Sequence, residues 1–305
     1  MRTMSLPACH CWINPVLLRR FMTLTLQGLC LLSLATLPAC SRLVSMAASD
    51  LADNLSHAIA NNDDPETVRE GAAAYLLMLD GMIHSDPENE ALLTKAAALY
   101  STYGAAFVQD PERARKLSNR ALDYAVRAVC VRYPDDCGLR QVNFEVFKSR
   151  LQRIERKDVP VFFTLGSAWA GWIQAHKGDL EAVAELSRVE VIMQRIVDID
   201  ETYQQGSAHL YLGTFAILVP PALGGQPEAA REHFDRAITL SKGENLMAKV
   251  VYAQHYARMV YDRDLHDRLL GEVLAADPQV PEMVLQNTLA QDRARALMAS
   301  ADDFF

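Results

Sequence analysis

One helix-start signal recurs along this chain and restricts its fold more than any other feature. The tripeptide Asp-Pro-Glu occurs at residues 64–66, 86–88 and 110–112. An Asp side chain accepts hydrogen bonds from the free amides of a helix's first turn, and Pro at the first helical position loses no hydrogen bond. Glu in the same turn meets the positive end of the helix dipole. Each tripeptide therefore predicts a helix that begins at its Pro.

Further signals of this kind divide the rest of the chain. Residues 226–228 (Gln-Pro-Glu) are a variant helix start, and residues 178–179 (Gly-Asp) are typical of a helix stop followed by a new cap. Between the signals, apolar residues recur with the helical period. Three such faces comprise Leu92, Ala96, Leu99, Tyr103 and Phe107; Ala230, Phe234, Ala237 and Ile238; and Leu265, Leu269, Leu270 and Val273. Residues 159–165 are the best strand candidate, but they have no obvious partner strand in the sequence, and we interpret them as the start of a helix after Pro160.

The linkers and one internal motif indicate how these helices pair. Helices of about 12 to 20 residues joined by short linkers pack antiparallel to their neighbours. In residues 212–213 (Leu-Gly), followed by Ala230, Phe234 and Ala237, the chain matches the tetratricopeptide pattern, with a link about five residues longer than the roughly 34-residue repeat allows. We predict an all-α chain of antiparallel, tetratricopeptide-like helical hairpins that form a compact solenoid or bundle. The alternative is a helical bundle without repeats.

The extra length of that hairpin lies in its link, at residues 218–228. Two prolines there cannot continue a helix, and two glycines permit backbone conformations that other residues avoid. The inserted segment combines a stiff Pro-Pro pair with a flexible Gly-Gly pair, which indicates a loop with a function. The alternative is an insertion that the hairpin merely tolerates. We predict that a partner or ligand contacts this loop through Pro220, Pro221, Leu223, Gly224 and Gly225.

The densest aromatic cluster of the sequence contains Trp169 and Trp172. These residues are three positions apart, so they share a helix face. The Trp N–H and Tyr O–H groups add directional hydrogen bonds to a large apolar area. We assign Trp169, Trp172 and Tyr211 to the ligand- or partner-binding site, as the lining of an apolar groove or pore. The alternative is that the tryptophans pack in the core.

The N-terminal segment has the layout of an export signal. Arg19 and Arg20 precede an uncharged apolar run at residues 21–37. Residues 37–40 then read Leu-Pro-Ala-Cys, which resembles the lipobox of bacterial lipoproteins, where the Cys is acylated and becomes the new N-terminus. An ordinary cleaved signal that ends near a Cys is the alternative.

From this layout we predict two parts of the chain. Residues 1–39 are a lipoprotein signal peptide, and residues 40–305 are an all-helical domain anchored by acyl chains on Cys40, which hold it to a bacterial membrane on the periplasmic side. Ser41 stands where an inner-membrane retention signal would place Asp, which favours the outer membrane.

Two cysteines remain outside the N-terminal segment and its lipobox. Cys130 and Cys137 flank a Tyr-Pro dipeptide, and the Pro turns the chain so that a short loop can close. An oxidising compartment favours their pairing, so we predict a disulfide, with two free thiols as the alternative. A cysteine pair without an accompanying His does not indicate a zinc site.

Charge and missing motifs exclude several classes of function. The chain has 30 basic and 38 acidic residues, a net charge of -8, and three of the basic residues lie in the predicted signal. An acidic surface repels phosphate and argues against nucleic-acid binding. Residues 166–169 (Gly-Ser-Ala-Trp) are not a nucleophile elbow, and no zinc-protease, phosphate-loop or dinucleotide motif occurs. We therefore expect no catalysis, no cofactor and no metal, and interpret His255 and His266 as structural.

Several segments together resemble one known family. They are residues 206–213, the loop at 220–228, residues 245–250, residues 256–270 and residues 287–304. These segments are similar to the T-component of TRAP transporters, the TatT lipoprotein family. The resemblance implies a periplasmic helical protein with tetratricopeptide-like hairpins, a homotrimer with a central pore, and association with the solute-binding protein of a TRAP uptake system.

Two functions agree with these features. The first is a non-enzymatic accessory component of a TRAP-type transport system that docks a solute-binding protein and channels an apolar solute. The alternative is a general cell-envelope scaffold that assembles other proteins without transport.

Overall fold

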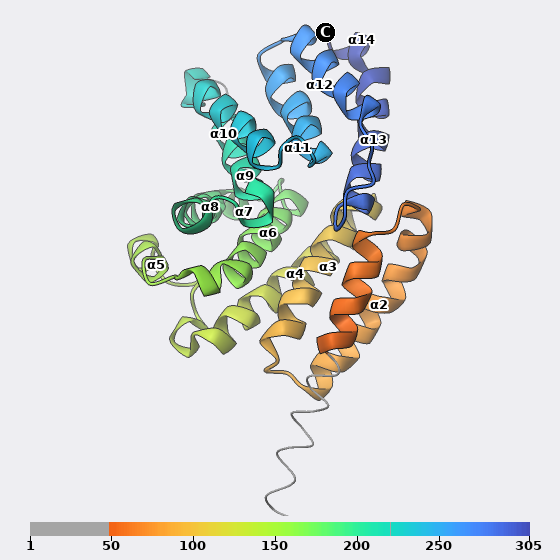
Figure 1. The fold of residues 1–305 in the computed structure, drawn as a ribbon. Helices are drawn as coiled ribbons and strands as arrows, with labels where there is room; N and C mark the ends of the chain where they lie inside the picture. Colours follow the sequence, from red (N-terminus) through yellow and green to blue (C-terminus); the bar gives the residue numbers. More distant parts are fainter. Residues whose placement is uncertain (1–48, 220) are drawn as a thin grey trace, which may run out of the picture. The chain divides into compact units, whose positions relative to one another are not determined.

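The computed structural model describes residues 49–219 and 221–305 (Figure 1). The predicted signal peptide, the predicted lipidation site at Cys40 and the loop residue Pro220 lie outside the described residues. Within them, no helix combines the length and the apolar character needed to cross a membrane.

The described chain is helical and contains no strand, which confirms the all-α prediction. A helix over residues 49–60 comes first. It is followed by α2 (Pro65–Ser85), α3 (Glu90–Phe107), α4 (Pro111–Arg132), α5 (Phe144–Leu151), α6 (Val159–Ala175), α7 (Leu180–Ala184), α8 (Leu186–Asp200), α9 (Ser207–Ala216), α10 (Pro227–Leu240), α11 (Leu246–Val251), α12 (Arg263–Ala275), α13 (Val284–Ala299) and α14 (Ala301–Phe304). Consecutive helices such as α3 and α4, α9 and α10, and α12 and α13 pack against each other, as short linkers require.

Two of the three Asp-Pro-Glu signals begin a helix as predicted. Asp64 and Asp110 are N-caps whose side chains accept from the backbone amides of Glu66 and Arg113. The prediction for residues 86–88 is wrong: these residues form a turn, and α3 begins at Glu90 instead of at Pro87.

The reason for that difference is a second capping residue close by. The Asn89 side chain accepts from the amide of Leu92 at 3.0 Å and is the N-cap of α3. Asp86 instead ends α2, with its amide bonded to the carbonyl of Met82 at 2.9 Å. Of the two candidate caps, which stand three residues apart, the later one caps α3.

The other helix starts agree with the sequence. Asp179 caps α7, with its side chain accepting from the amide of Glu181. Pro227 stands at the first position of α10. Residues 159–165 are the first turns of α6, with Pro160 in its first turn, so their interpretation as a helix is confirmed.

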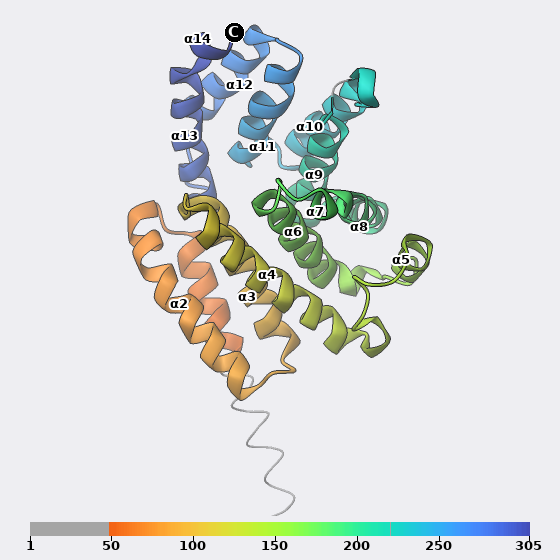
Figure 2. The same cartoon turned by 180° about the vertical axis from the view of Figure 1, so that it is seen from behind.

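The first part of the chain packs its helices around α4 and α6. Helix α4 contacts both α3 and α6, which also contact each other, and α6 in turn contacts α8 (Figure 2). The buried side chains of α6 include Phe162, Leu165 and Trp169. This order of contacts places α2 and α4 on either side of α3.

The helices α9 and α10 approach each other closely at Gly213. A Cβ atom on Gly213 would lie 3.1 Å from Phe234 Cζ and 3.2 Å from the carbonyl oxygen of Ala230, so the absent side chain permits the close approach. The Phe234 ring is fully buried and stacks on Tyr252 with 4.9 Å between ring centroids. This hairpin is the centre of an apolar cluster that extends into α11, α12 and α13.

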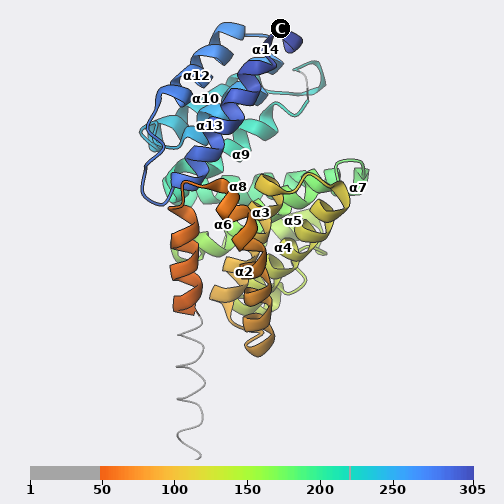
Figure 3. The same cartoon turned by 90° about the vertical axis from the view of Figure 1, so that its right-hand side faces the viewer.

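The end of the first helix contacts the segment that precedes α13 (Figure 3). The Asn61 side chain accepts from the amide of Glu282 at 2.8 Å and donates to its carboxylate at 3.1 Å. His57 pairs with the same carboxylate, and α13 contacts α2. The first helices are therefore held to the segment that precedes α13.

Candidate functional site

The loop between α9 and α10 closes at its base through one backbone bond. The Gln226 amide donates to the carbonyl of Ala216 at 2.7 Å, and Ile217 is buried beside it. Within the loop, residues 221–223 form a single 3-10 turn, and the Gly224 amide bonds to the carbonyl of Pro221 at 3.0 Å. The base holds the loop to the rigid hairpin that carries it.

The described loop residues present an apolar, uncharged surface. Leu218 is 52% exposed and Val219 is 42% exposed, and Pro221 and Ala222 are also exposed. Residues 217–225 carry no charged side chain. Contiguous exposed apolar residues are typical of interaction surfaces, because stability alone would bury them.

The glycines of this loop have different environments. Gly224 has φ +99°, a conformation that side-chain-bearing residues rarely adopt, and no atom lies within 4 Å of a Cβ placed there. Gly225 is half-buried next to it. Backbone geometry, and not crowding, explains the Gly at 224.

Trp169 packs in the core, which was the alternative to a role in binding. Its side chain is fully buried, and its ring meets Phe147 edge-on with 6.0 Å between centroids. The indole N–H donates to the Glu185 carboxylate at 2.6 Å. A partner has no access to this side chain in the structure.

Trp172 is half-buried and lies on a more open side of α6. The guanidinium of Arg140 stands 4.1 Å from its ring centroid, and His176 stacks on it with 4.6 Å between centroids. The indole N–H donates to Asn119 Oδ1 of α4 at 2.7 Å. Trp172 therefore stays a candidate for contact with a partner.

Tyr211 has different neighbours from both tryptophans. Its ring meets those of Phe163 and Phe215, at 6.1 and 6.2 Å between centroids. Burial raises the pKa of the Tyr211 hydroxyl to about 12. No hydrogen bond or ring contact within the described residues joins Tyr211 to Trp169 or Trp172, so the structure does not gather the predicted residues into one site.

A histidine pair that the sequence analysis missed lies where α9 and α10 meet. His209 Nδ1 and His233 Nδ1 are 2.8 Å apart, and Glu201 Oε2 is 3.6 Å from His209 Nε2. Burial, followed by the neighbouring imidazole, lowers the pKa of His209, and burial also lowers the pKa of His233. The hairpin register was the available signal, because His209 lies one turn before Gly213 on α9 and His233 directly precedes Phe234, which packs on Gly213.

The two histidines singled out from the sequence have separate structural environments. His266 is fully buried, with Nδ1 2.8 Å from the carboxylate of Asp267 and its ring against Phe305. His255 lies in the π-helical turn over residues 252–257. Among the described residues, no group of three or more potential ligands could hold a metal ion.

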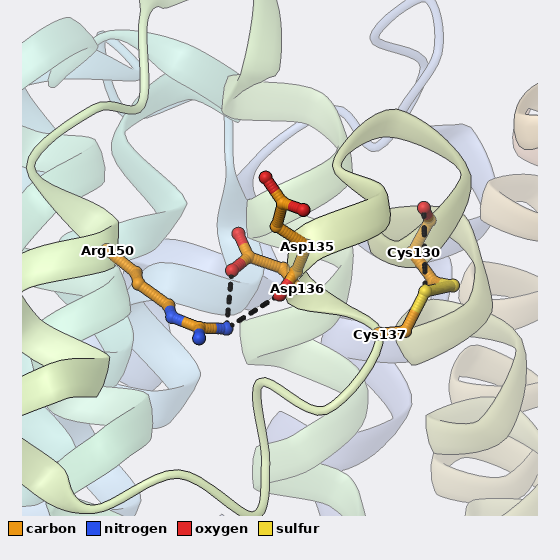
Figure 4. The surroundings of a disulfide bond; sticks show 5 residues. All are labelled: Cys130, Asp135, Asp136, Cys137 and Arg150. Carbon is orange, nitrogen blue, oxygen red and sulfur yellow. Dashed lines mark hydrogen bonds and ion pairs between the residues drawn. A yellow bond between two sulfur atoms is a disulfide. The ribbon is translucent and has the colours of Figure 1, made fainter.

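Cys130 and Cys137 are joined by a disulfide where α4 ends (Figure 4). Their Cα atoms are 4.3 Å apart, and the chain between them turns through residues 134–136. In this turn the buried Asp136 carboxylate accepts from Arg150 at 2.9 Å and pairs with Arg153. The turn is thus held by a covalent bond and by two cations.

Comparison with known proteins decides the family. The model of the TRAP transporter T-component family matches residues 61–305. The chain belongs to this family. It is also 26% identical over 275 residues to an uncharacterized protein of Treponema pallidum (strain Nichols), an alignment that covers 83% of this chain and 84% of that protein. The T-component family is one of transport accessory proteins, which supports a role in TRAP transport and a cell-envelope location.

Proposed function

We propose that this T-component is a periplasmic lipoprotein that docks the solute-binding protein of a TRAP system and passes an apolar solute to or from it. The family match over residues 61–305 carries the proposal. The uncharged, exposed loop after α9 supports it, because such a surface suits a protein contact. The tetratricopeptide-like character of the hairpins belongs to the same proposal and is supported by the packing of Gly213 against Phe234.

The proposal places the docking contact at the α9–α10 loop, at Pro220, Pro221, Leu223, Gly224 and Gly225, with Trp172 and Tyr211 as further candidates. The test uses the full-length protein in detergent and the purified solute-binding protein from the same genome. Replacing Leu218 and Val219 together by Ser should weaken binding by about 1–2 kcal/mol, because both side chains are exposed and apolar.

A matched control exists on α7. Leu180 is 84% exposed and Val183 is 39% exposed, so their double replacement by Ser removes the same two side-chain types from another surface. This control should bind as the wild type does. Equal affinity for the loop variant, with unchanged helicity and melting, would show that the loop is only a tolerated insertion.

Two further parts of the proposal concern anchoring and assembly. Cys40→Ser should release the protein from membranes or stall its processing, and membrane fractionation with mass analysis measures this. Acyl chains on the variant would contradict the assignment. The homotrimer should have about three times the chain mass in light scattering. A concentration-independent monomer would remove the central pore from the proposal.

A further inference from the structure

A groove of about 560 Å³ lies between α2 and α4, on helices other than those that carry the α9–α10 loop. Its apolar lining includes Leu76, Leu77 and Leu117, with Tyr100 of α3 among the lining residues. Leu77 is 71% exposed and lines the same groove as Leu76 and Leu117. The groove therefore offers apolar area that the described chain leaves uncovered.

The rim of this groove is cationic. Arg113, Lys116 and Arg120 line it, and all three are exposed. Arg120 pairs with Asp80 at 2.7 Å. Arg113 donates to the Tyr103 hydroxyl at 3.3 Å, and within the described residues neither Arg113 nor Lys116 forms an ion pair. Two positive charges thus remain uncompensated in a chain whose net charge is -8.

The same kind of surface continues from α4 to α6. Asn119 lines the groove, and its side chain accepts the indole N–H of Trp172. Arg140 covers the Trp172 ring at 4.1 Å. An occupant longer than the groove itself would therefore meet further cationic and aromatic groups.

We infer that this groove binds an acidic polypeptide segment. One aliphatic or aromatic side chain of the segment packs on Leu77 and Leu117, and its carboxylates pair with Arg113 and Lys116. The inference rests on the proposed function in one respect, since it takes the segment to belong to the solute-binding protein. It adds a second, charge-selective contact to the uncharged one at the α9–α10 loop.

The form of the groove favours a polypeptide over a small anion. Small-molecule sites enclose their ligand and orient it with a few precisely placed polar groups. Here the cations are long, exposed side chains around an open apolar floor. An apolar centre with a charged rim is the arrangement of a protein–protein interface. The carboxylates of a folded partner would arrive already positioned, whereas a small anion would have to order all the cations itself.

The test measures binding of the purified solute-binding protein to full-length protein in detergent at low salt. The variant Arg113→Glu with Lys116→Glu should bind at least tenfold more weakly, because both attractive charges become repulsive. The difference should shrink at about 0.3 M NaCl, where exposed charges are screened. Neither residue forms an ion pair among the described residues, so the fold should be kept, which circular dichroism checks.

The matched control reverses two exposed lysines elsewhere, Lys148→Glu with Lys242→Glu. It changes the net charge equally and should bind within about twofold of the wild type. Equal weakening in both double variants would attribute the effect to net charge and would overturn the inference. Groove variants that bind as tightly as the wild type would also overturn it, while leaving the proposed docking function in place.

A solute-binding protein that does not bind the wild type would instead refute the proposed docking function. The groove is then tested with a fluorescent peptide, Glu-Glu-Leu-Leu-Glu-Glu, against a counterpart with Gln at each Glu. Preference for the acidic peptide, abolished by Arg113→Glu with Lys116→Glu, would support a groove for acidic segments. Equal binding of both peptides, or competition by succinate as strong as by the peptide, would overturn it.

Discussion

The two halves of the described chain stabilise their buried polar groups in different ways. In the N-terminal half, residues 49–200, the buried Asp158 accepts from Arg132 at 3.0 Å and from the Tyr133 hydroxyl at 2.7 Å. In the C-terminal half, residues 207–305, the buried polar groups include His209 and His266. In the N-terminal half, an arginine thus pairs with a buried carboxylate, whereas the C-terminal half buries imidazole rings.

This difference implies that the halves respond to different conditions. The N-terminal half has arginines paired with buried carboxylates, and a disulfide. The C-terminal half has aromatic packing around Phe234 and buried histidines, of which His209 has a lowered pKa. Core truncation, reducing agent and acid should therefore each act mainly on one half. Hydrogen exchange resolves such local effects, because helices open with different free energies.

The largest expected effect comes from truncating the core of the C-terminal half. Phe234→Ala should lower the free energy of unfolding by about 3–5 kcal/mol, because the ring is fully buried and stacked on Tyr252. Urea denaturation measures the loss. Exchange should rise most in α9 to α11, and Leu274→Ala, at a residue 37% exposed, is the milder control. An equal rise in α2 to α4 would show that the halves unfold as one unit.

A smaller effect should follow removal of the disulfide. Cys130→Ser with Cys137→Ser should cost about 2 kcal/mol, because the closed loop is short and restricts the unfolded chain only moderately. The increase in exchange should centre on the end of α4 and spare α10. Wild-type protein under non-reducing conditions should contain no alkylatable Cys130 or Cys137. Full labelling of both in the folded protein would rule the bond out.

Acidification should give the smallest effect, confined to the C-terminal half. Burial lowers the pKa of His209, His233 and His255 below the ordinary value of 6.5. Below that value the unfolded chain binds protons that the folded chain does not. The contribution of these groups to stability is therefore fully present above about pH 7 and declines as the pH falls.

The measurement compares urea midpoints at about pH 7.5 and about pH 5.5, a range in which histidines titrate. His209→Gln with His233→Gln should reduce the difference between the midpoints, whereas His84→Gln, at an exposed site, should not. If the double variant keeps the full pH dependence, the histidine pair is not its source.

Local signals explain which parts of the fold could be predicted. The helix starts at Asp64 and Asp110 follow from residues within one turn, and the same is true of Pro227. The prediction of a helix start at Asp86 was wrong because Asn89, within one turn of it, caps α3 instead. The sequence alone does not show which of two neighbouring capping residues is used. The all-α class follows from many such signals and tolerates one error.

The candidate sites depend on contacts between distant segments, and these were less predictable. The burial of Trp169 follows from the helices that surround α6, and the residue type alone does not distinguish a core tryptophan from a binding one. The groove is lined by residues of both α2 and α4. From the sequence, α4 can be recognised only as a charge-rich helix. In the sequence, Arg113 and Lys116 cannot be distinguished from the charged residues of an ordinary solvent-exposed helix face. Only the structure shows that they line the same groove as Leu77.

The contact between Asn61 and Glu282 spans 221 positions of the chain. The entropy needed to close such a span grows with its length, so we expect this contact to form late in folding. Because a chain is synthesised from its N-terminus, the first helices lack this contact until Glu282 has been synthesised. The order of synthesis thus makes this contact one of the last that the growing chain can form.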